Sequence, residues 1–400
     1  MRQHRAFRLA PCSAHRDTKG EPMPDTDRPA PFENAKNRFG FGCMRLPQFE
    51  DKSVDIEAFS AMVDAFMDAG LNYFDTAHMY VDGKSEDALR QALTSRYDRS
   101  EYVLVDKLST PFFNATEDIV PQLEKQLEIL GVDYLDILLM HAQGKTNYDK
   151  YQRLHAYKEA YKLVEDGRVK HFGISFHDTA DMLEQILTDH PEIEVVQIQL
   201  NYIDWDDPAV QSRACYEVCR KYGKPVIIME PIKGGTLVNL PDEAKAALAQ
   251  AGDGSPASFA LRFAADHEGV EMVLSGMGAM EQLQDNLSTF SPFVPLSEAD
   301  HAAIERVTKI LRAQNAIPCT ACRYCTDGCP KDIKIPDLFA CLNAKRIYQD
   351  WNQDYYYSQV HTQGHGKASD CIKCGKCEKA CPQHLHIREL LEDVAATFEK

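Results

Sequence analysis

Two runs of cysteines near the end of the chain carry its clearest chemical signal. Each run has three cysteines at every third position, a fourth cysteine four positions later, and then proline. This is the ligand spacing of [4Fe–4S] clusters. Structural zinc sites are usually built from separated cysteine pairs, so zinc is a weaker alternative and disulfide bonding is weaker still. The candidate metal ligands are Cys319, Cys322, Cys325 and Cys329 in the first run, and Cys371, Cys374, Cys377 and Cys381 in the second.

The repeated run resembles the bacterial-type two-cluster ferredoxins. This resemblance implies two [4Fe–4S] clusters, with the fourth cysteine of each run bound to the cluster of the other run. Between the runs, we expect a helix over 335–348 and an aromatic stretch, 351–357, that packs within this spacer; a helix over 387–398 closes the domain. The implied ligand sets are Cys319, Cys322, Cys325 and Cys381 for one cluster, and Cys371, Cys374, Cys377 and Cys329 for the other.

A second set of reactive side chains follows short apolar runs earlier in the chain. Asp75 ends one run, with Tyr80 shortly after it, and Lys107 and His141 end the next two. A lysine ammonium lowers the pKa of a nearby phenol, and a carboxylate holds the lysine charged. A histidine can orient a carbonyl oxygen. Together these residues indicate protonation of a carbonyl oxygen while hydride reaches its carbon.

Eight apolar runs, each trailed by an amphipathic run, must position these side chains. Such alternation predicts a parallel sheet with helices outside it, and eight units predict an α/β fold of the (β/α)₈ TIM-barrel type. An open doubly wound sheet is the alternative, but residues 39–44 lack its glycine-rich turn opening directly into a helix. In a barrel, the carboxyl ends of the strands meet at one mouth. The predicted strands are 39–46, 71–76, 102–107, 134–141, 169–176, 195–202, 225–231 and 271–277.

Several of these segments resemble the aldo-keto reductase family over about residues 38–295. The matching elements are Phe-Asp-Thr-Ala-His-Met-Tyr at 74–80, Gly-Lys-Ser-Glu at 83–86, Lys107, His141, Gly-Ile-Ser at 173–175, Gln197, Gly276 and residues 281–286. The resemblance implies Tyr80 as general acid/base, Lys107 and Asp75 as the residues that adjust its pKa, and His141 as the residue that orients the substrate. It also implies a nicotinamide cofactor across the barrel mouth. The implied cofactor-binding residues are Ser175 and Gln197 at the carboxamide, with Gly276, Gln282 and Asn286 after the eighth strand.

Three positions depart from the family pattern. Phe176 stands where an asparagine is common, and Glu230 stands where an aromatic residue often stacks on nicotinamide. Residues 275–284 contain no lysine or arginine to meet the 2′-phosphate of NADPH. The sequence therefore leaves NADPH and NADH both open.

Composition limits the classes of binding partner and the cellular location that the sequence allows. A net charge of −17 over 400 residues disfavours binding to nucleic acid or to an anionic membrane, and no apolar stretch is long enough to span a bilayer. Thirteen cysteines, an odd number, favour a reducing, cytoplasmic location with metal-bound thiolates. We expect a disordered N-terminal tail and linker over 1–37, with Met23 as the true start, a barrel over 38–305 and an iron–sulfur domain over 306–400.

These features predict an NAD(P)H-dependent oxidoreductase that reduces an aldehyde, ketone or quinone and is fused to a two-cluster electron-transfer domain. The expected partners are a small-molecule carbonyl substrate and a redox protein that docks at the iron–sulfur domain. The alternative is an electron-transfer or redox-sensing protein that uses the barrel as a non-catalytic scaffold. No flavin motif is found that would join two-electron hydride chemistry to one-electron clusters.

Overall fold

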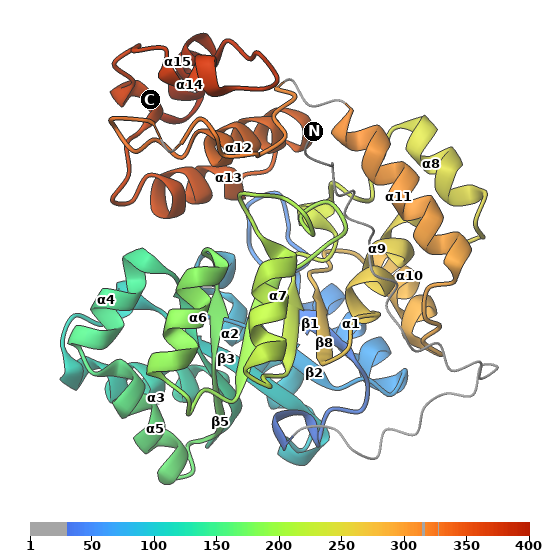
Figure 1. Ribbon diagram of the computed structural model, residues 1–400. Helices are drawn as coiled ribbons and strands as arrows, with labels where there is room; N and C mark the ends of the chain where they lie inside the picture. The colour runs from blue at the N-terminus through green and yellow to red at the C-terminus, as the bar shows by residue number, and fades with distance from the viewer. Residues whose placement is uncertain (1–29, 314–316, 327) are drawn as a thin grey trace.

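The first part of the chain forms a closed barrel of eight parallel strands, paired in sequence order from β1 to β8 and back to β1 (Figure 1). A computed structural model describes residues 30–313, 317–326 and 328–400. Closure confirms the predicted barrel and excludes the open sheet. The strands are β1 (Phe39–Gly42), β2 (Tyr73–Asp75), β3 (Val103–Leu108), β4 (Leu135–Gln143), β5 (Val169–Phe176), β6 (Val195–Gln199), β7 (Val226–Met229) and β8 (Val270–Ser275).

Alternate residues of the strands fill the barrel interior, as the period of two along a strand requires. Val103 and Val105 of β3 and Leu139 of β4 belong to this inner cluster, while their neighbours face the surrounding helices. Gly40 lies in β1 because a side chain there would collide with the Tyr73 ring, 2.8 Å from an added Cβ atom. Because this inner cluster packs the strands against one another, their carboxyl ends are held in fixed positions around one mouth.

Helices follow every strand and cover the outside of the barrel. Two helices, α4 (Lys145–Arg153) and α5 (Ala156–Glu165), follow β4, and the chain breaks between them at His155, which has a φ of 52°. The helix α1 begins after Asp55, whose carboxylate accepts a hydrogen bond from the Ala58 N–H at 3.0 Å. The helices of this part are α1 (Ile56–Asp68), α2 (Ser85–Leu89), α3 (Ile119–Leu130), α4 (Lys145–Arg153), α5 (Ala156–Glu165), α6 (Ala180–Asp189), α7 (Ser212–Lys221), α8 (Asp242–Ala249), α9 (Pro256–Ala265) and α10 (Met280–Phe290).

The expected N-terminal linker contributes to the barrel floor. Residues 1–29, including the expected start at Met23, lie outside the described residues, but Phe32 is fully buried against Tyr73 with ring centroids 6.3 Å apart. Both residues belong to the cluster inside the barrel. Within the expected linker, Phe32 thus packs on the barrel, because it gains apolar burial there.

The helix α11 (Glu298–Arg312) packs on α8 and α9 through Ala303, Ile304, Val307 and Leu311 (Figure 1). The domain boundary expected at residue 305 falls inside this helix. Since α11 buries its apolar side against the barrel helices along its whole length, we propose that the boundary follows Arg312.

The C-terminal region, orange to red in Figure 1, forms a small helical domain above the barrel mouth. Its helices are α12 (Ile335–Tyr348), α13 (Asn352–Tyr355), α14 (Lys376–Ala380) and α15 (Ile387–Phe398), so both helices predicted here are confirmed. Tyr356 and Tyr357 are buried, but contrary to the expectation their packing is not confined to the spacer: Tyr357 stacks on Phe398 of α15 at 4.6 Å, and Tyr356 packs on the barrel. Among the residues that the structure describes, no helix is both long enough and apolar enough to cross a bilayer.

Candidate active site and cysteine centres

A cavity of about 500 Å³ opens at the carboxyl ends of the barrel strands. Asp75, Tyr80, His141 and Gln197 line it, so the structure brings together predicted residues from β2, β4 and β6 and from the loop after β2. Met44, Met79, Met229 and Leu274 give the cavity an apolar wall. A concave, mainly apolar site with a few converging polar groups is typical of a small-molecule site.

Lys107 lies beneath this cavity and is completely buried. Its Nζ atom donates to Asp75 Oδ1 at 2.5 Å and to the Thr76 carbonyl oxygen at 2.7 Å. The same atom lies 4.7 Å from the centre of the Tyr80 ring. Burial opposes the charge, but Asp75 and the Tyr80 phenol raise the pKa of Lys107 above its ordinary value. The ammonium is therefore held charged beside the phenol.

The Tyr80 phenol keeps its proton. Burial raises its pKa above 10.0, and the Lys107 ammonium only partly offsets this rise. Lysine therefore lowers the phenol pKa as expected, but burial has the larger effect. The ring also lies edge-on to His141, with centroids 5.9 Å apart.

His141 is a neutral imidazole at ordinary pH. Burial lowers its pKa well below 6.5, and Lys107 and His177 lower it further. Its Nδ1 atom lies 2.5 Å from the Ser109 hydroxyl oxygen. When Ser109 donates this hydrogen bond, Nε2 carries the ring hydrogen and can donate to a ligand oxygen.

The five predicted cofactor-binding residues are divided between the cavity and its surroundings. Gln197 and Gly276 line the cavity, and Gln197 also donates to Asp75 Oδ2 at 3.1 Å. Ser175 is buried and accepts a hydrogen bond from the Ala142 N–H at 2.8 Å. Gln282 accepts a hydrogen bond from the Gly278 N–H at 2.8 Å, and Asn286 donates to Ser275 at 3.1 Å. Ser175, Gln282 and Asn286 do not line the cavity, and the cofactor role of all five residues stays a prediction.

Several lining residues were not predicted to belong to this site. Arg45 lies 3.8 Å from Glu230, the residue at the position expected for an aromatic side chain. His177 directly follows β5, and its place after a strand end could have revealed it. Trp351 and Tyr355 come from the C-terminal domain. No local signal ties that spacer to the barrel, because the contact joins segments far apart in sequence.

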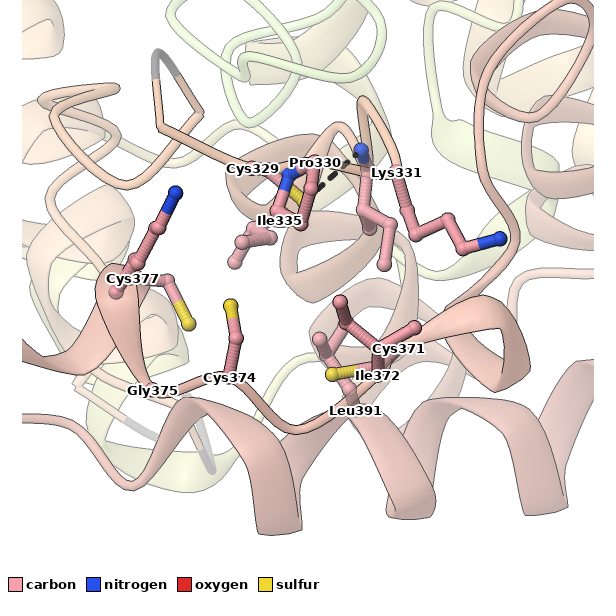
Figure 2. Close-up of a pocket in the computed structure, with 12 residues that line it drawn as sticks. Cys329, Pro330, Lys331, Ile335, Cys371, Ile372, Cys374, Gly375, Cys377 and Leu391 are labelled. Carbon is pink, nitrogen blue, oxygen red and sulfur yellow. Dashed lines mark hydrogen bonds between the residues drawn. The ribbon is translucent and has the colours of Figure 1, made fainter.

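The eight candidate cysteine ligands gather into two groups of four. One cavity is lined by Cys371, Cys374, Cys377 and Cys329; Figure 2 shows their sulfurs turned toward a common space. The other cavity is lined by Cys319, Cys322, Cys325 and Cys381. Each group therefore takes three cysteines from one run and the fourth from the other run.

Backbone groups and apolar side chains complete these cavities. The Ala321 N–H donates to Cys319 Sγ at 3.5 Å, and the Ile333 N–H donates to Cys329 Sγ at 3.5 Å. Ile335 lines both cavities. Among the described residues, no three His, Cys, Asp or Glu side chains are grouped closely enough to hold one metal ion. Sulfurs spread around a cavity fit a multi-iron cluster better than a single zinc ion.

Comparisons with known proteins agree with this organisation. The model of the aldo/keto reductase family matches residues 38–309, and the 4Fe-4S dicluster domain model matches residues 318–386. The methylglyoxal reductase YeaE of Escherichia coli is 26% identical over 270 residues, covering 64% of this chain and 87% of that protein. The uncharacterized oxidoreductase YqkF of Bacillus subtilis is 23% identical over 302 residues, covering 68% of this chain and 92% of that protein.

A solved structure shares the barrel fold. It is an aldo-keto reductase from Klebsiella pneumoniae in complex with NADPH, with a TM-score of 0.54, 23% identity, and coverage of 68% of this chain and 90% of that one. The family match spans the whole barrel, including Tyr80, Lys107, Asp75 and His141, and the second match spans all eight candidate cysteine ligands. This chain is therefore a member of the aldo/keto reductase family that carries a C-terminal 4Fe-4S dicluster domain.

Proposed function

We propose that this protein reduces the carbonyl group of a small molecule with NADPH or NADH, using Tyr80 as the general acid. The observation that carries the proposal is the arrangement of Tyr80, Lys107 and Asp75 at one cavity, with His141 on the same wall. This arrangement provides a protonated phenol, a fixed ammonium and a neutral hydrogen-bond donor around the place for one oxygen atom.

The residues act on that oxygen in a defined order. His141 Nε2–H orients the carbonyl oxygen toward the Tyr80 hydroxyl. Tyr80 gives its proton to the oxygen as negative charge develops there, and the nearby Lys107 ammonium stabilises the phenolate that is left. Asp75 keeps Lys107 in place at 2.5 Å. Water then returns a proton to Tyr80, so the protein is unchanged after each turnover.

The cavity fits a nicotinamide ring and its carboxamide. When bound, the reduced nicotinamide supplies a hydride to the carbonyl carbon, so the cofactor is oxidised and the carbonyl becomes an alcohol. Gln197 offers its amide oxygen to the carboxamide, because its amide nitrogen is already held by Asp75. Gly276 has no side chain and leaves room at the mouth for the sugar–phosphate part of the cofactor. The NADPH complex of the Klebsiella structure supports NADPH as the first cofactor to test.

The two cysteine cavities fit two [4Fe–4S] clusters. Four sulfurs line each cavity, and N–H groups donate to a sulfur in each. When bound, such clusters carry single electrons. Cys322 and Cys374 are the exposed members of their groups, so a redox partner protein would approach the clusters at these residues.

The test is steady-state NADPH oxidation by the anaerobically purified holoprotein with aldehydes, ketones and quinones. Tyr80→Phe removes only the acidic hydroxyl, so we expect kcat to fall about 10²–10⁴-fold, with NADPH binding unchanged. Tyr97→Phe is the matched control, because Tyr97 bonds Asp64 on the outer helices. Full activity of Tyr80→Phe would refute the proposed role of Tyr80.

A scaffold function for the barrel is the competing hypothesis. It predicts that wild-type protein oxidises NADPH no faster with carbonyl compounds than without them. The buried pair of Lys107 and Asp75 favours the reductase, because a scaffold gains little from burying charges next to a cavity.

A further inference from the structure

The spacer between the two cysteine runs forms one wall of the barrel cavity. Trp351, Asn352 and Tyr355 line the same cavity as Tyr80 and His141. The Tyr355 ring lies 5.8 Å from the His177 ring, which belongs to the barrel. The iron–sulfur domain therefore completes the site at which we propose that the barrel performs its chemistry.

A buried ion-pair cluster of Lys233, Asp204 and Asp350, called the clasp below, joins this spacer to the barrel. Lys233, which follows β7, places Nζ 2.7 Å from Asp204 Oδ1 and 2.9 Å from Asp350 Oδ2. Asp350 directly precedes Trp351, and all three charged side chains are at most 5% exposed. One positive charge thus joins a barrel carboxylate to a carboxylate of the spacer.

Further contacts extend the clasp along the spacer. The Tyr356 hydroxyl donates to Gln199 Oε1 at 3.3 Å, and Tyr356 is packed with Ala209 and Val210 of the barrel. His361 Nε2 lies 3.1 Å from the Ala209 carbonyl oxygen. These contacts lie on both sides of Tyr355, so the wall has a fixed position.

The rim of the cavity is apolar although it is open to solvent. Met44, Met79 and Trp351 are 39%, 48% and 52% exposed, and they come from three separate segments. Large exposed apolar side chains that gather around a cavity mark a binding surface. Here they surround the opening through which a substrate must enter.

We propose that Trp351 and Tyr355 are specificity-determining residues that bind the aromatic body of a carbonyl substrate. The proposal rests on the proposed reductase function. The substrate carbonyl points to Tyr80 and His141, while its flat apolar part lies between the methionines of the rim and the two aromatic rings. Aromatic rings favour such a partner because stacked or edge-on ring contacts add to the burial of apolar surface.

The kinetic test compares an aromatic and a small aldehyde with the NADPH-loaded full-length holoprotein. In Trp351→Ala and Tyr355→Ala, we expect KM for 4-nitrobenzaldehyde to rise about fivefold to tenfold, while KM and kcat for propanal stay within about twofold. Trp351→Phe keeps an aromatic ring, so it should retain most of the affinity for 4-nitrobenzaldehyde that Trp351→Ala loses. Tyr161→Ala is the control, since it removes a 45% exposed ring from the barrel helix α5, outside the cavity. Equal KM changes for the two aldehydes, or none, would overturn the proposal.

A binding test separates this proposal from the reductase function. The chain has two tryptophans, so Trp205→Phe leaves Trp351 as the only tryptophan reporter. We expect saturable quenching of Trp351 emission by benzaldehyde without NADPH, and weaker binding in the Tyr355→Ala background. Saturable quenching in a protein that reduces no aldehyde would refute the reductase and keep the aromatic site. Linear quenching alone would refute the aromatic site.

Discussion

Lys233→Met should loosen the spacer from the barrel. The substitution removes the shared ammonium and leaves Asp204 and Asp350 buried and facing each other. Breaking a buried ion pair from one side costs about 3–5 kcal/mol, because the remaining charge is desolvated without its partner. Asp204 keeps hydrogen bonds from Gln199 and Asn201, so the cost should be at the lower end, about 3 kcal/mol.

Asp350→Asn provides a milder perturbation of the same clasp. It leaves the Lys233–Asp204 pair intact at 2.7 Å and keeps the size of the side chain. The expected loss of stability is therefore about 1.5–3 kcal/mol, the value of a hydrogen bond to a charged group. Burial alone would raise the pKa of Asp350, but Lys233 and Gln353 hold it below its ordinary value. This contribution to stability is present above the ordinary carboxyl pKa and is lost as the pH falls through the lower folded value.

Urea unfolding of the anaerobic holoprotein in the Trp205→Phe background, followed by Trp351 emission, measures both effects. In the double variant Lys233→Met/Asp350→Leu, the loss of unfolding free energy should be smaller than the sum of the losses in Lys233→Met and Asp350→Leu alone. The reason is that the second change removes a buried carboxylate that Lys233→Met would leave without a cation. Unchanged free energy of unfolding in Lys233→Met, within about 0.5 kcal/mol, would show that the buried charges do not hold the spacer.

Three further predictions concern the pH profile, the cysteine groups and the barrel core. Tyr80 has a raised pKa and stays protonated, and His141 has a lowered pKa and stays neutral, so kcat/KM should be flat between about pH 6 and 9; an inflection near 6.5 would contradict this. Cys381→Ala should lower the iron content and alter the EPR spectrum of the cluster held by the first cysteine run; a change confined to the other cluster would contradict the crossed grouping. Gly173→Ala would place Cβ 2.5 Å from Val195, so the melting temperature should fall by an amount equivalent to about 1–3 kcal/mol.

Most of the barrel could be predicted because its signals are local. The eight apolar runs end within a few residues of the strands, and the residues at their carboxyl ends converge as the barrel geometry requires. The grouping of Cys381 with the first run was implied by the resemblance to two-cluster ferredoxins, and the structure places it there. Helix α4 was missed because its sequence, Lys145–Arg153, is strongly polar and lacks an apolar stripe.

The parts that could not be predicted depend on distant contacts. The pKa of Tyr80 depends on how deeply the phenol is buried, which spacing alone does not reveal. Nothing in the sequence distinguishes Lys233 from an ordinary surface lysine, yet it is buried between carboxylates of two domains. Trp351 lies 210 residues from His141 along the chain, but both line one cavity.

The exchange of one cysteine between the two groups constrains the order in which the protein can mature. Neither cavity has its four sulfurs until Cys371 to Cys381 have left the ribosome, although the barrel sequence is complete much earlier. Completion of either group therefore requires residues of the second cysteine run, and the two groups share this requirement. A chain truncated before Cys371 would retain a whole barrel sequence and no complete set of sulfurs.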